Sequence, residues 1–425
     1  VISGTNGNII KAGTGTLTLS GANTYTGTTT INAGDLTVSG SLHDSTAVTI
    51  ASGADYNVNA SDTVASIEGA GNIVIASSQT LTAGDGNDKT LSGVISGAGN
   101  YIKAGSGTQT LSASNTYTGT TQVSAGTLTV SGSGRLSDST AVTVDSGAVY
   151  NVAVSDTVAS IAGAGSITLG SNTLTSGGSD ASTTFSGVIS GTNGNIIKAG
   201  TGTLTLTGNN SYTGSTTISA GLLKIIRDDP TSYLAATSGF TGPGNLTIES
   251  SGDDFTADIV TGTHVQLAGT ALGNLIIGKT GNARQIDLSS DITTTGTQTY
   301  NGPVRLVGGD RTVSTTNSNV IFASTVNSDG TQRALTVTNG TGDTTFSGAI
   351  GGSAPVKSLT ITSDQLTAGA ITLNGALTAT LGGSSSITGV IANGASTANL
   401  VKAGSGTLTL SASNTYTGTT QVSAG

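Results

Sequence analysis

Short stretches in which apolar and polar residues alternate recur along this chain of 425 residues. Residues 16–19 read Thr-Leu-Thr-Leu, and residues 35–38 read Asp-Leu-Thr-Val. Alternation with a period of two residues is typical of a β-strand that buries one face. Gly-Asn pairs at 7–8, 99–100 and 194–195 mark turns between such stretches. The pattern therefore predicts an all-β chain with strands of roughly three to five residues and frequent turns.

A segment of 24 residues occurs four times, always with the same length. It reads KAG-x-GT-x-TL-x-x-x-N-x-YTG-x-T-x-[IV]-x-AG, and it spans 11–34, 103–126, 198–221 and 402–425. Repeats at such periods are the signature of stacked architectures, in which each unit buries its apolar face against its neighbours. Together with the short strands, they predict a parallel β-solenoid with roughly 20 residues per coil. At about 4.8 Å per coil, the whole chain would form an elongated rod on the order of 100 Å long.

The spacing of the repeats predicts the organisation of the chain. We expect repeat units at 1–93 and 94–187, the start of a third at 188–221, a divergent charged insertion or loop-bearing coils at 222–295, coils of a second repeat type at 296–389, and the start of a further unit at 390–425. The chain has no Met and both of its ends fall within repeats, so we expect it to be a fragment of a longer protein.

Two polar positions of the repeat have competing interpretations. The Asn of the NxYTG motif is expected to be a turn or buried ladder residue whose amide bonds to the backbone of neighbouring coils, with a ligand role as the alternative. The Tyr two residues later is expected to pack at the edge of the core, with a glycan-stacking stripe as the alternative. The positions are Asn23, Asn115, Asn210 and Asn414, and Tyr25, Tyr117, Tyr212 and Tyr416.

Composition narrows the possible functions. Only 9% of residues are charged, 3% are aromatic, and the net charge is −9. The 14 basic residues form no stripe, which argues against nucleic-acid binding. No apolar run reaches the length of about 18 residues that a membrane span needs, so we expect no membrane-spanning segment in this chain. The absence of Cys excludes disulfides and thiolate metal sites. We expect no cofactor.

Charge gathers in one region, 222–311, which holds 15 of the 37 charged residues. Within it, Asp229, Pro230 and Gly239 could serve as N-cap, first helical residue and stop, so we expect a short helical excursion or a loop there. Solenoid enzymes cluster acids with Arg or Lys on neighbouring coils for acid/base or calcium work.

The nearest equivalent of such an enzyme site is Asp253, Asp254 and Asp258 with Arg284, and Asp287 lies close by in the sequence. No second acidic constellation completes a dyad. We therefore expect these residues to bind a ligand at most, and we expect no enzyme.

One further stretch resembles a metal site. The sequence GDGND at 84–88 resembles half of an RTX calcium repeat, with Asp85 and Asp88 as candidate ligands. Such sites need several tandem copies, and the corresponding stretch 177–187 lacks the motif. We therefore favour an ordinary polar turn over calcium binding. The two histidines, His43 and His264, lie in unrelated sequence contexts, which argues against a Ser/His/Asp triad.

The four copies strongly resemble the passenger-associated transport repeat of autotransporters and related giant surface proteins of Gram-negative bacteria. The stretch 296–365, with GTQTYNGPVRL and TTFSGAIGG, resembles the filamentous-haemagglutinin-like repeats of long bacterial adhesins. The resemblance implies a right-handed parallel β-helix that is exported across the outer membrane to the cell surface. It also implies a family that avoids Cys and whose members include adhesins, fibres and some enzymes carried on the β-helix.

From these observations we expect a structural stalk or filament segment of a long secreted or cell-surface protein, within an adhesin passenger. Three alternatives stay open. The charged region 222–311 could bind a glycan or another cell-surface ligand directly. Chains could associate end to end into an extracellular filament. A polysaccharide-active β-helix enzyme is the third alternative.

Overall fold

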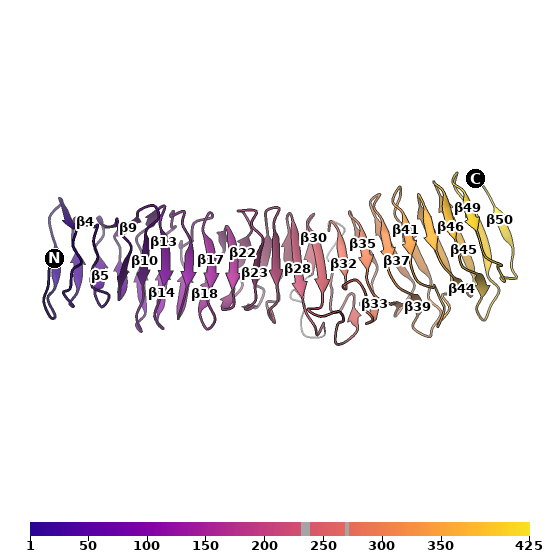
Figure 1. Ribbon diagram of the computed structural model, residues 1–425, viewed down its shortest axis with the longest axis horizontal. Helices are drawn as coiled ribbons and strands as arrows, with labels where there is room; N and C mark the ends of the chain where they lie inside the picture. The colour runs from indigo at the N-terminus through magenta and orange to yellow at the C-terminus, as the bar shows by residue number, and fades with distance from the viewer. Residues whose placement is uncertain (231–238, 268–271) are drawn as a thin grey trace. The chain divides into compact units, whose positions relative to one another are not determined.

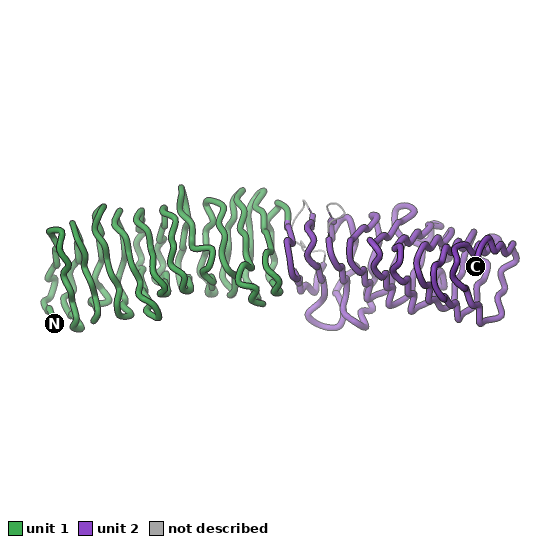
Figure 2. Tube along the Cα trace, turned by 90° about the horizontal axis from the view of Figure 1, so that it is seen from above, with its two compact units in different colours: residues 1–215 green, residues 216–425 purple. Residues whose placement is uncertain are grey.

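The computed structural model describes residues 1–230, 239–267 and 272–425. Throughout these ranges the chain forms strands and turns without a helix. No helix that could cross a membrane is therefore found there. The helical excursion expected between Asp229 and Gly239 falls on 231–238, which lie outside the described residues. The chain divides into two compact units, Val1–Ser215 and Thr216–Gly425, coloured separately in Figure 2.

Unit 1 is a stack of coils in which up to three strands per turn belong to different parallel ladders (Figure 1). The first ladder contains β1 (Ile9–Lys11), β3 (Thr29–Ile31), β5 (Ala47–Ile50), β8 (Ser66–Gly69), β11 (Lys89–Leu91), β14 (Thr108–Leu111), β16 (Thr127–Val130), β18 (Val149–Val152), β21 (Ser166–Thr168) and β24 (Val188–Ser190). The second contains β2 (Thr16–Leu19), β4 (Gly34–Val38), β6 (Ala54–Val58), β9 (Asn72–Ile75) and β12 (Ile95–Gly97).

Two further ladders complete unit 1. One contains β7 (Asp62–Val64), β10 (Thr80–Ala83), β13 (Asn100–Lys103), β15 (Thr121–Val123), β17 (Ala141–Val144), β20 (Ser160–Gly163), β23 (Thr183–Phe185) and β26 (Thr203–Leu206). The other contains β19 (Asp156–Val158), β22 (Thr173–Ser176) and β25 (Asn195–Lys198). Within one coil, β8, β9 and β10 pair with β11, β12 and β13 of the next coil.

Unit 2 is built in the same way. Its longest ladder contains β28 (Leu222–Ile226), β30 (Asn245–Glu249), β32 (Leu275–Ile277), β35 (Gln298–Tyr300), β38 (Val320–Phe322), β41 (Thr344–Phe346), β43 (Leu366–Ala368), β46 (Ser385–Ile387) and β49 (Leu408–Leu410). A second contains β34 (Ile292–Thr294), β37 (Arg311–Thr315), β40 (Leu335–Thr338), β42 (Leu359–Ser363), β45 (Ala376–Leu381), β48 (Asn399–Ala403) and β50 (Thr420–Val422).

Shorter ladders close the coils of unit 2. They are β31 (Ile259–Val260), β33 (Ile286–Leu288), β36 (Val304–Leu306) and β39 (Val326–Ser328); β44 (Ile371–Leu373) with β47 (Ile391–Asn393); and β27 (Thr216–Ile218) with β29 (Phe240–Thr241). The predicted parallel β-solenoid with coils of roughly 20 residues is thus confirmed within each unit.

The register sets the size of each coil. In unit 1 the sequence separation between paired residues varies little, and Thr127 with Val149 is an example of the widest spacing. In unit 2 the separation varies more, and the widest pairing, Leu246 with Leu275, encloses a clearly longer stretch of chain. Insertions in the sequence are therefore absorbed as larger coils while the ladders continue.

The core lies inside the coils because alternate strand residues point inward. In β5 and β10 every second residue is buried, and these are Val48, Ile50, Leu81 and Ala83. Burying a side chain of the size of Val or Leu contributes about 1.5–3 kcal/mol. The Thr residues between them face outward, as the alternation in the sequence predicts.

Candidate functional site

A buried lysine at the start of each repeated segment is held by backbone carbonyl groups of two coils. Lys103, at the end of β13, is 1% exposed. Its Nζ donates hydrogen bonds to the carbonyl oxygens of Ala104 at 2.6 Å and Gly105 at 2.9 Å in its own coil, and of Ala125 at 3.1 Å in the next. An ammonium group has three N–H donors, so all three are used. Burial lowers the pKa of Lys103, although the charges of Asp85 and Asp88 oppose this shift.

The other copies repeat this arrangement, which we call the lysine cage. The bonds run from Lys11 to Ala12, Gly13 and Ala33, from Lys402 to Ala403, Gly404 and Ala424, and from Lys198 to Ala199 and Gly200. The lysine cage also explains why the motif contains glycines. Gly126 has a φ of 62°, and a Cβ placed there would lie 2.4 Å from the carbonyl oxygen of Gly107. The turn that presents the cage carbonyls therefore requires glycine.

The motif asparagine links three consecutive coils. The Oδ1 of Asn115 accepts a hydrogen bond from the Ile95 amide at 2.8 Å. Its Nδ2 donates to the carbonyl oxygens of Ala113 at 3.0 Å and Arg135 at 2.7 Å. The same contacts join Asn23 to Ile2, Gly21 and Ser41, while Asn210 and Asn414 accept from the amides of Ile189 and Ile391. The predicted buried ladder role is confirmed for Asn23, Asn115 and Asn210, while Asn414 is half-buried.

The motif tyrosines pack in the core. Tyr25, Tyr117 and Tyr212 are at most 1% exposed. The hydroxyl of Tyr25 is 2.5 Å from the hydroxyl of Thr29, and Tyr117 makes the same contact with Thr121. Buried rings cannot stack on a ligand, so the glycan-stacking alternative is wrong for these three positions. The Lys and Asn of the repeat therefore bond between coils, while the Tyr bonds to a Thr of its own coil.

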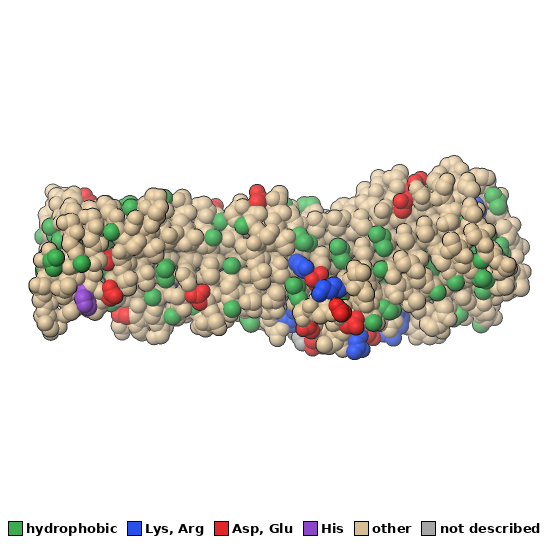
Figure 3. Space-filling view, in the orientation of Figure 1, with side chains coloured by type: hydrophobic (Ala, Val, Ile, Leu, Met, Phe, Trp, Pro, Cys, Tyr) green, Lys and Arg blue, Asp and Glu red, His purple; other side chains and the backbone are tan. Residues whose placement is uncertain are grey.

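Of the four residues predicted to bind a ligand, Asp253, Asp254 and Asp258 lie in the largest coil of unit 2, and Arg284 lies in the coil that follows. Asp254 accepts a hydrogen bond from the amide of Ala283 through Oδ1, and Asp258 accepts one from the amide of Gln285 at 3.3 Å. Arg284 donates from Nε to the carbonyl oxygen of Phe255 at 3.1 Å. These three side chains thus join one coil to the next, while Asp253 is exposed. Figure 3 shows charged side chains gathered over the coils around β33.

The structure assembles a charged cluster there that differs from the predicted one. Asp287 on β33 and Arg305 on β36 are paired in register. Arg305 donates from Nε to Oδ1 of Asp287 at 2.8 Å and from Nη2 to Oδ2 at 2.5 Å, and it lies 4.0 Å from Asp258. The hydrogen bonds to Asp287 raise the pKa of Arg305. The guanidinium engages both oxygens of Asp287, so this carboxylate forms a two-point ion pair between neighbouring coils.

Arg305 was missed by sequence reasoning, which named Arg284 instead. The signal was present as two short strands with a charged central residue, IDL at 286–288 and VRL at 304–306. Opposite charges at matching strand positions on consecutive coils would have suggested the pair, but only once the register was known.

The two calcium candidates both accept hydrogen bonds from protein groups, Asp85 within its turn and Asp88 from the next coil. Asp85 accepts from the amide of Asn87 at 2.7 Å and from its Nδ2 at 2.9 Å. Burial raises the pKa of Asp85, but these bonds and the charge of Lys89 outweigh it and the pKa is lowered. Asp88 accepts from the amide of Thr108 at 2.7 Å, one coil later. Over the ranges that the structure describes, no group of three or more His, Cys, Asp or Glu is placed to hold a metal ion. The ordinary polar turn stays the favoured prediction, with calcium binding at Asp85 and Asp88 as the alternative.

The two histidines lie in different units. The Nδ1 of His43 is 2.8 Å from the hydroxyl of Ser45, in a turn of unit 1. In unit 2, the Nδ1 of His264 accepts a hydrogen bond from the amide of Val260 at 3.0 Å, and burial lowers the pKa of His264.

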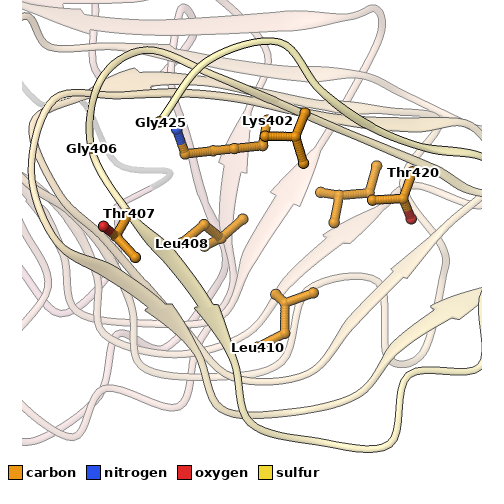
Figure 4. A pocket seen from close by; sticks show the side chains of 9 residues that line it. Lys402, Gly406, Thr407, Leu408, Leu410, Thr420 and Gly425 are labelled. Carbon is orange, nitrogen blue, oxygen red and sulfur yellow. The ribbon is translucent and has the colours of Figure 1, made fainter.

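A cavity of about 230 Å³ lies in the last coil of unit 2 (Figure 4). Its lining includes Lys402, Leu408, Leu410, Thr420 and Val422. These positions correspond to interior residues of the second copy, where Leu111 and Val123 are fully buried by the following coil. The cavity is therefore the open interior of a coil, and its apolar lining is core material.

Comparison with known proteins agrees with the repeat. Residues 9–38, 102–130, 196–225 and 400–425 match the passenger-associated-transport-repeat family. The chain is also 34% identical over 146 residues to the adhesin BmaC autotransporter of Brucella suis biovar 1 (strain 1330). That alignment covers 32% of this chain and 4% of the adhesin, so the chain corresponds to a small part of that relative's length. No solved structure matches. The chain thus carries four segments that match the passenger-associated-transport-repeat family, and part of it is similar to an autotransporter adhesin.

Proposed function

We propose that this chain is a structural stalk segment that separates the binding part of a surface adhesin from the cell. The observation that supports this proposal most is the use of the repeat's polar residues. Lys103 and Asn115 each bond to the backbone of a neighbouring coil from a buried position. A repeat that uses its buried polar side chains to connect one coil to the next is suited to building a long and rigid segment.

The physics of the fold favours the same role. In a parallel solenoid each coil satisfies the backbone hydrogen bonds of the coils on either side, so strand edges are covered along its length. Stability then grows by the addition of coils, each with the same neighbour contacts, and duplication extends the protein without redesign. The identical stretches 1–19 and 188–206 illustrate such duplication.

A deletion in register tests the stalk proposal. Removing 11–102 from the full surface protein joins Ile10 to Lys103, whose counterpart is Lys11, and so removes one complete repeat unit. We expect bacterial attachment to be retained, with the labelled tip of the protein about 20 Å closer to the membrane, the rise of four to five coils. Resistance to protease is the control for folding. Loss of attachment by a protease-resistant deletion protein would contradict the stalk role.

Direct ligand binding by the charged coils is the second candidate. It is favoured by the enlarged coil between Leu246 and Leu275, whose segment 251–254 is exposed and includes Asp253. The relative from Brucella is named an adhesin, which fits either a stalk or a binding segment. Asp253→Asn removes one exposed charge, and Asp138→Asn in an exposed turn of unit 1 is the matched control. If this region binds, attachment falls in the first variant and not in the second; equal attachment would count against it.

A further inference from the structure

Unit 1 contains two copies of a buried tyrosine–aspartate pair. Asp62 on β7 and Asp156 on β19 are 4% and 3% exposed. The hydroxyl of Tyr56 donates to Oδ2 of Asp62 at 2.8 Å, and the Leu42 amide donates to its Oδ1 at 3.0 Å. In the second copy Tyr150 donates to Oδ2 of Asp156.

The backbone contacts of the second pair match as well. The amide of Leu136 donates to Oδ2 of Asp156 at 3.1 Å, and the amide of Thr157 donates to Oδ1 at 3.0 Å. The arrangement therefore recurs in both repeats of the unit.

The groups that face each carboxyl differ in one respect. Those acting on Asp62 are Tyr56, Tyr25 and Asp44, none of which is a cation. Those acting on Asp156 are Tyr150 and Tyr117, together with the guanidinium of Arg135. The strands that pair with β7 and β19 are β10 (TLTA) and β22 (TLTS), which carry no titratable side chain.

Burial of a carboxylate without a cation favours its neutral form. Burial raises the pKa of Asp62 to about 6, even though the hydrogen bonds from Tyr56 and Leu42 lower it. Burial also raises the pKa of Asp156, where the hydrogen bonds and the charge of Arg135 act in the opposite direction. In an unfolded chain both side chains would titrate near the usual value of about 3.9.

We propose that the Tyr56–Asp62 and Tyr150–Asp156 pairs link the folding of unit 1 to proton uptake, so that this unit becomes harder to unfold as its surroundings turn mildly acidic. The folded unit holds the aspartic acids protonated where the unfolded chain has already lost those protons. This stabilisation is fully present below the unfolded pKa and is lost as pH rises through the folded pKa. For Asp62 the window runs from about 4 to about 6.

The size of the effect follows from the shift. A change of one pKa unit corresponds to a tenfold change in the folding equilibrium constant. For Asp62 the equilibrium constant for folding is therefore expected to fall by up to roughly a hundredfold between pH 4 and pH 7. Exposed carboxyls with lowered pKa values, such as Asp85 and Asp329, act with the opposite sign, but only below their usual range. Between about pH 4 and about pH 6, the pH dependence of stability is therefore expected to come from the buried tyrosine–aspartate pairs.

The two repeats offer a built-in comparison. Ser41 and Arg135 occupy matching positions, since each forms an isolated bridge to the coil before it and each carbonyl accepts a bond from the motif asparagine. Ser41→Arg should therefore supply Asp62 with the cation that Asp156 already has. This variant keeps the carboxyl and the tyrosine in place.

The experiment measures the denaturant midpoint of unit 1 in the full chain, by hydrogen exchange of its core amides, at several values between about pH 4.5 and about pH 7.5. We expect the wild-type midpoint to fall as pH rises. Asp62→Asn should remove most of the pH dependence of the midpoint. Ser41→Arg should shift the fall of the midpoint to lower pH. Tyr56→Phe should move it to higher pH, because it removes a donor to the charged form. Asp138→Asn, in an exposed turn, is the control and should keep the wild-type profile.

The outcomes separate clearly. A wild-type midpoint that is constant or rises across this range would overturn the proposal, as would a profile in Asp62→Asn that has the wild-type slope. If Asp62→Asn fails to fold, the Ser41→Arg variant provides the test. A pH dependence of its denaturant midpoint equal to that of the wild type would count against the proposal.

Discussion

Units 1 and 2 share one fold, and the lysine cage recurs in unit 2 at Lys402, but the coils of unit 2 that diverge from the repeat are joined by different contacts. Unit 1 joins its coils through buried polar side chains, of which Lys103 and Asn115 are examples. Unit 2 carries a stack of aromatic rings, Tyr300, Phe322 and Phe346, with centroids 5.1 and 4.8 Å apart on consecutive coils. Among the ion pairs of the described residues, one lies in unit 1 and five lie in unit 2.

The difference shows what duplication and divergence each do to a solenoid. Duplicated coils inherit the same polar contacts, and the lengths of their coils stay within a narrow range. The diverged coils of unit 2 differ more in length, up to the coil between Leu246 and Leu275, and cross-coil contacts arise there from stacked rings and charge pairs instead. Neighbouring coils of a solenoid therefore need side-chain contacts with one another, but these contacts can be of different chemical types.

The variant expected to have the largest effect is Phe322→Ala, in the centre of the ring stack of unit 2. Removal of a buried Phe is expected to destabilise unit 2 by about 3–5 kcal/mol, including the loss of two stacking contacts. Hydrogen exchange under denaturant would report each unit separately. Phe322→Leu keeps most of the volume and is the control, with an expected loss of about 1 kcal/mol. An equal loss in unit 1 would show that the two units unfold together and would break the distinction.

Lys103→Met tests the lysine cage of unit 1. The Met side chain keeps the apolar stem but removes three donors, which leaves the carbonyl oxygens of Ala104, Gly105 and Ala125 without them. We expect a loss of about 3 kcal/mol in the coils around β13. Lys89→Met is the matched control, because Lys89 forms a partly exposed pair with Glu68 and should cost less than about 1 kcal/mol. Similar losses in both variants would contradict a special role for the cage.

Asn115→Ala should have a smaller effect in the same unit. It removes three hydrogen bonds that connect three coils, and a loss of about 2 kcal/mol is expected. Asn87→Ala removes an exposed turn contact and serves as control. Denaturant unfolding followed by circular dichroism gives both values. A loss below that of the control would mean that water replaces the amide, and the link between coils would then be unimportant.

The ion pairs of unit 2 should matter least. Lys357 and Asp310 are 3.2 Å apart, but their side chains are 56% and 54% exposed. Lys357→Gln should change the free energy of unfolding by no more than about 0.5 kcal/mol. Arg305→Gln, which breaks the pair with the buried Asp287, should cost more. The order of the two losses, measured at low and high salt, is the readout, and a reversed order would contradict this ranking.

Much of the fold could be predicted from the sequence, because period-two alternation and a repeat of fixed length each report on local geometry. Asn115 and Tyr117 were placed correctly, since their position between turn signals and strands restricts what they can contact. The cage of Lys103 was not foreseen. Its acceptors are backbone carbonyls, which carry no identity in the sequence, and Ala125 belongs to the following coil.

The charged residues were harder to place for a related reason. Asp287 and Arg305 meet only because coils of unequal length put them in register, and that register cannot be counted from the sequence alone. Asp62 and Asp156 sit in the duplicated stretch DTVASI, which was recognised as a repeat. The burial of these two aspartates was not predicted, because an aspartate at the start of a strand usually faces solvent.

The lysine cage also bears on how such a chain acquires its structure. The third acceptor of Lys103, the carbonyl of Ala125, belongs to the very next coil along the sequence. Even the widest strand pairing among the described residues, Leu246 with Leu275, joins consecutive coils. The entropy lost in closing each coil is therefore set by a short loop and does not increase with the total length of the protein. Because folding slows with the sequence separation of contacts, a chain many times longer should form each coil about as fast as this one. Growth by duplication thus leaves the kinetics of folding nearly untouched.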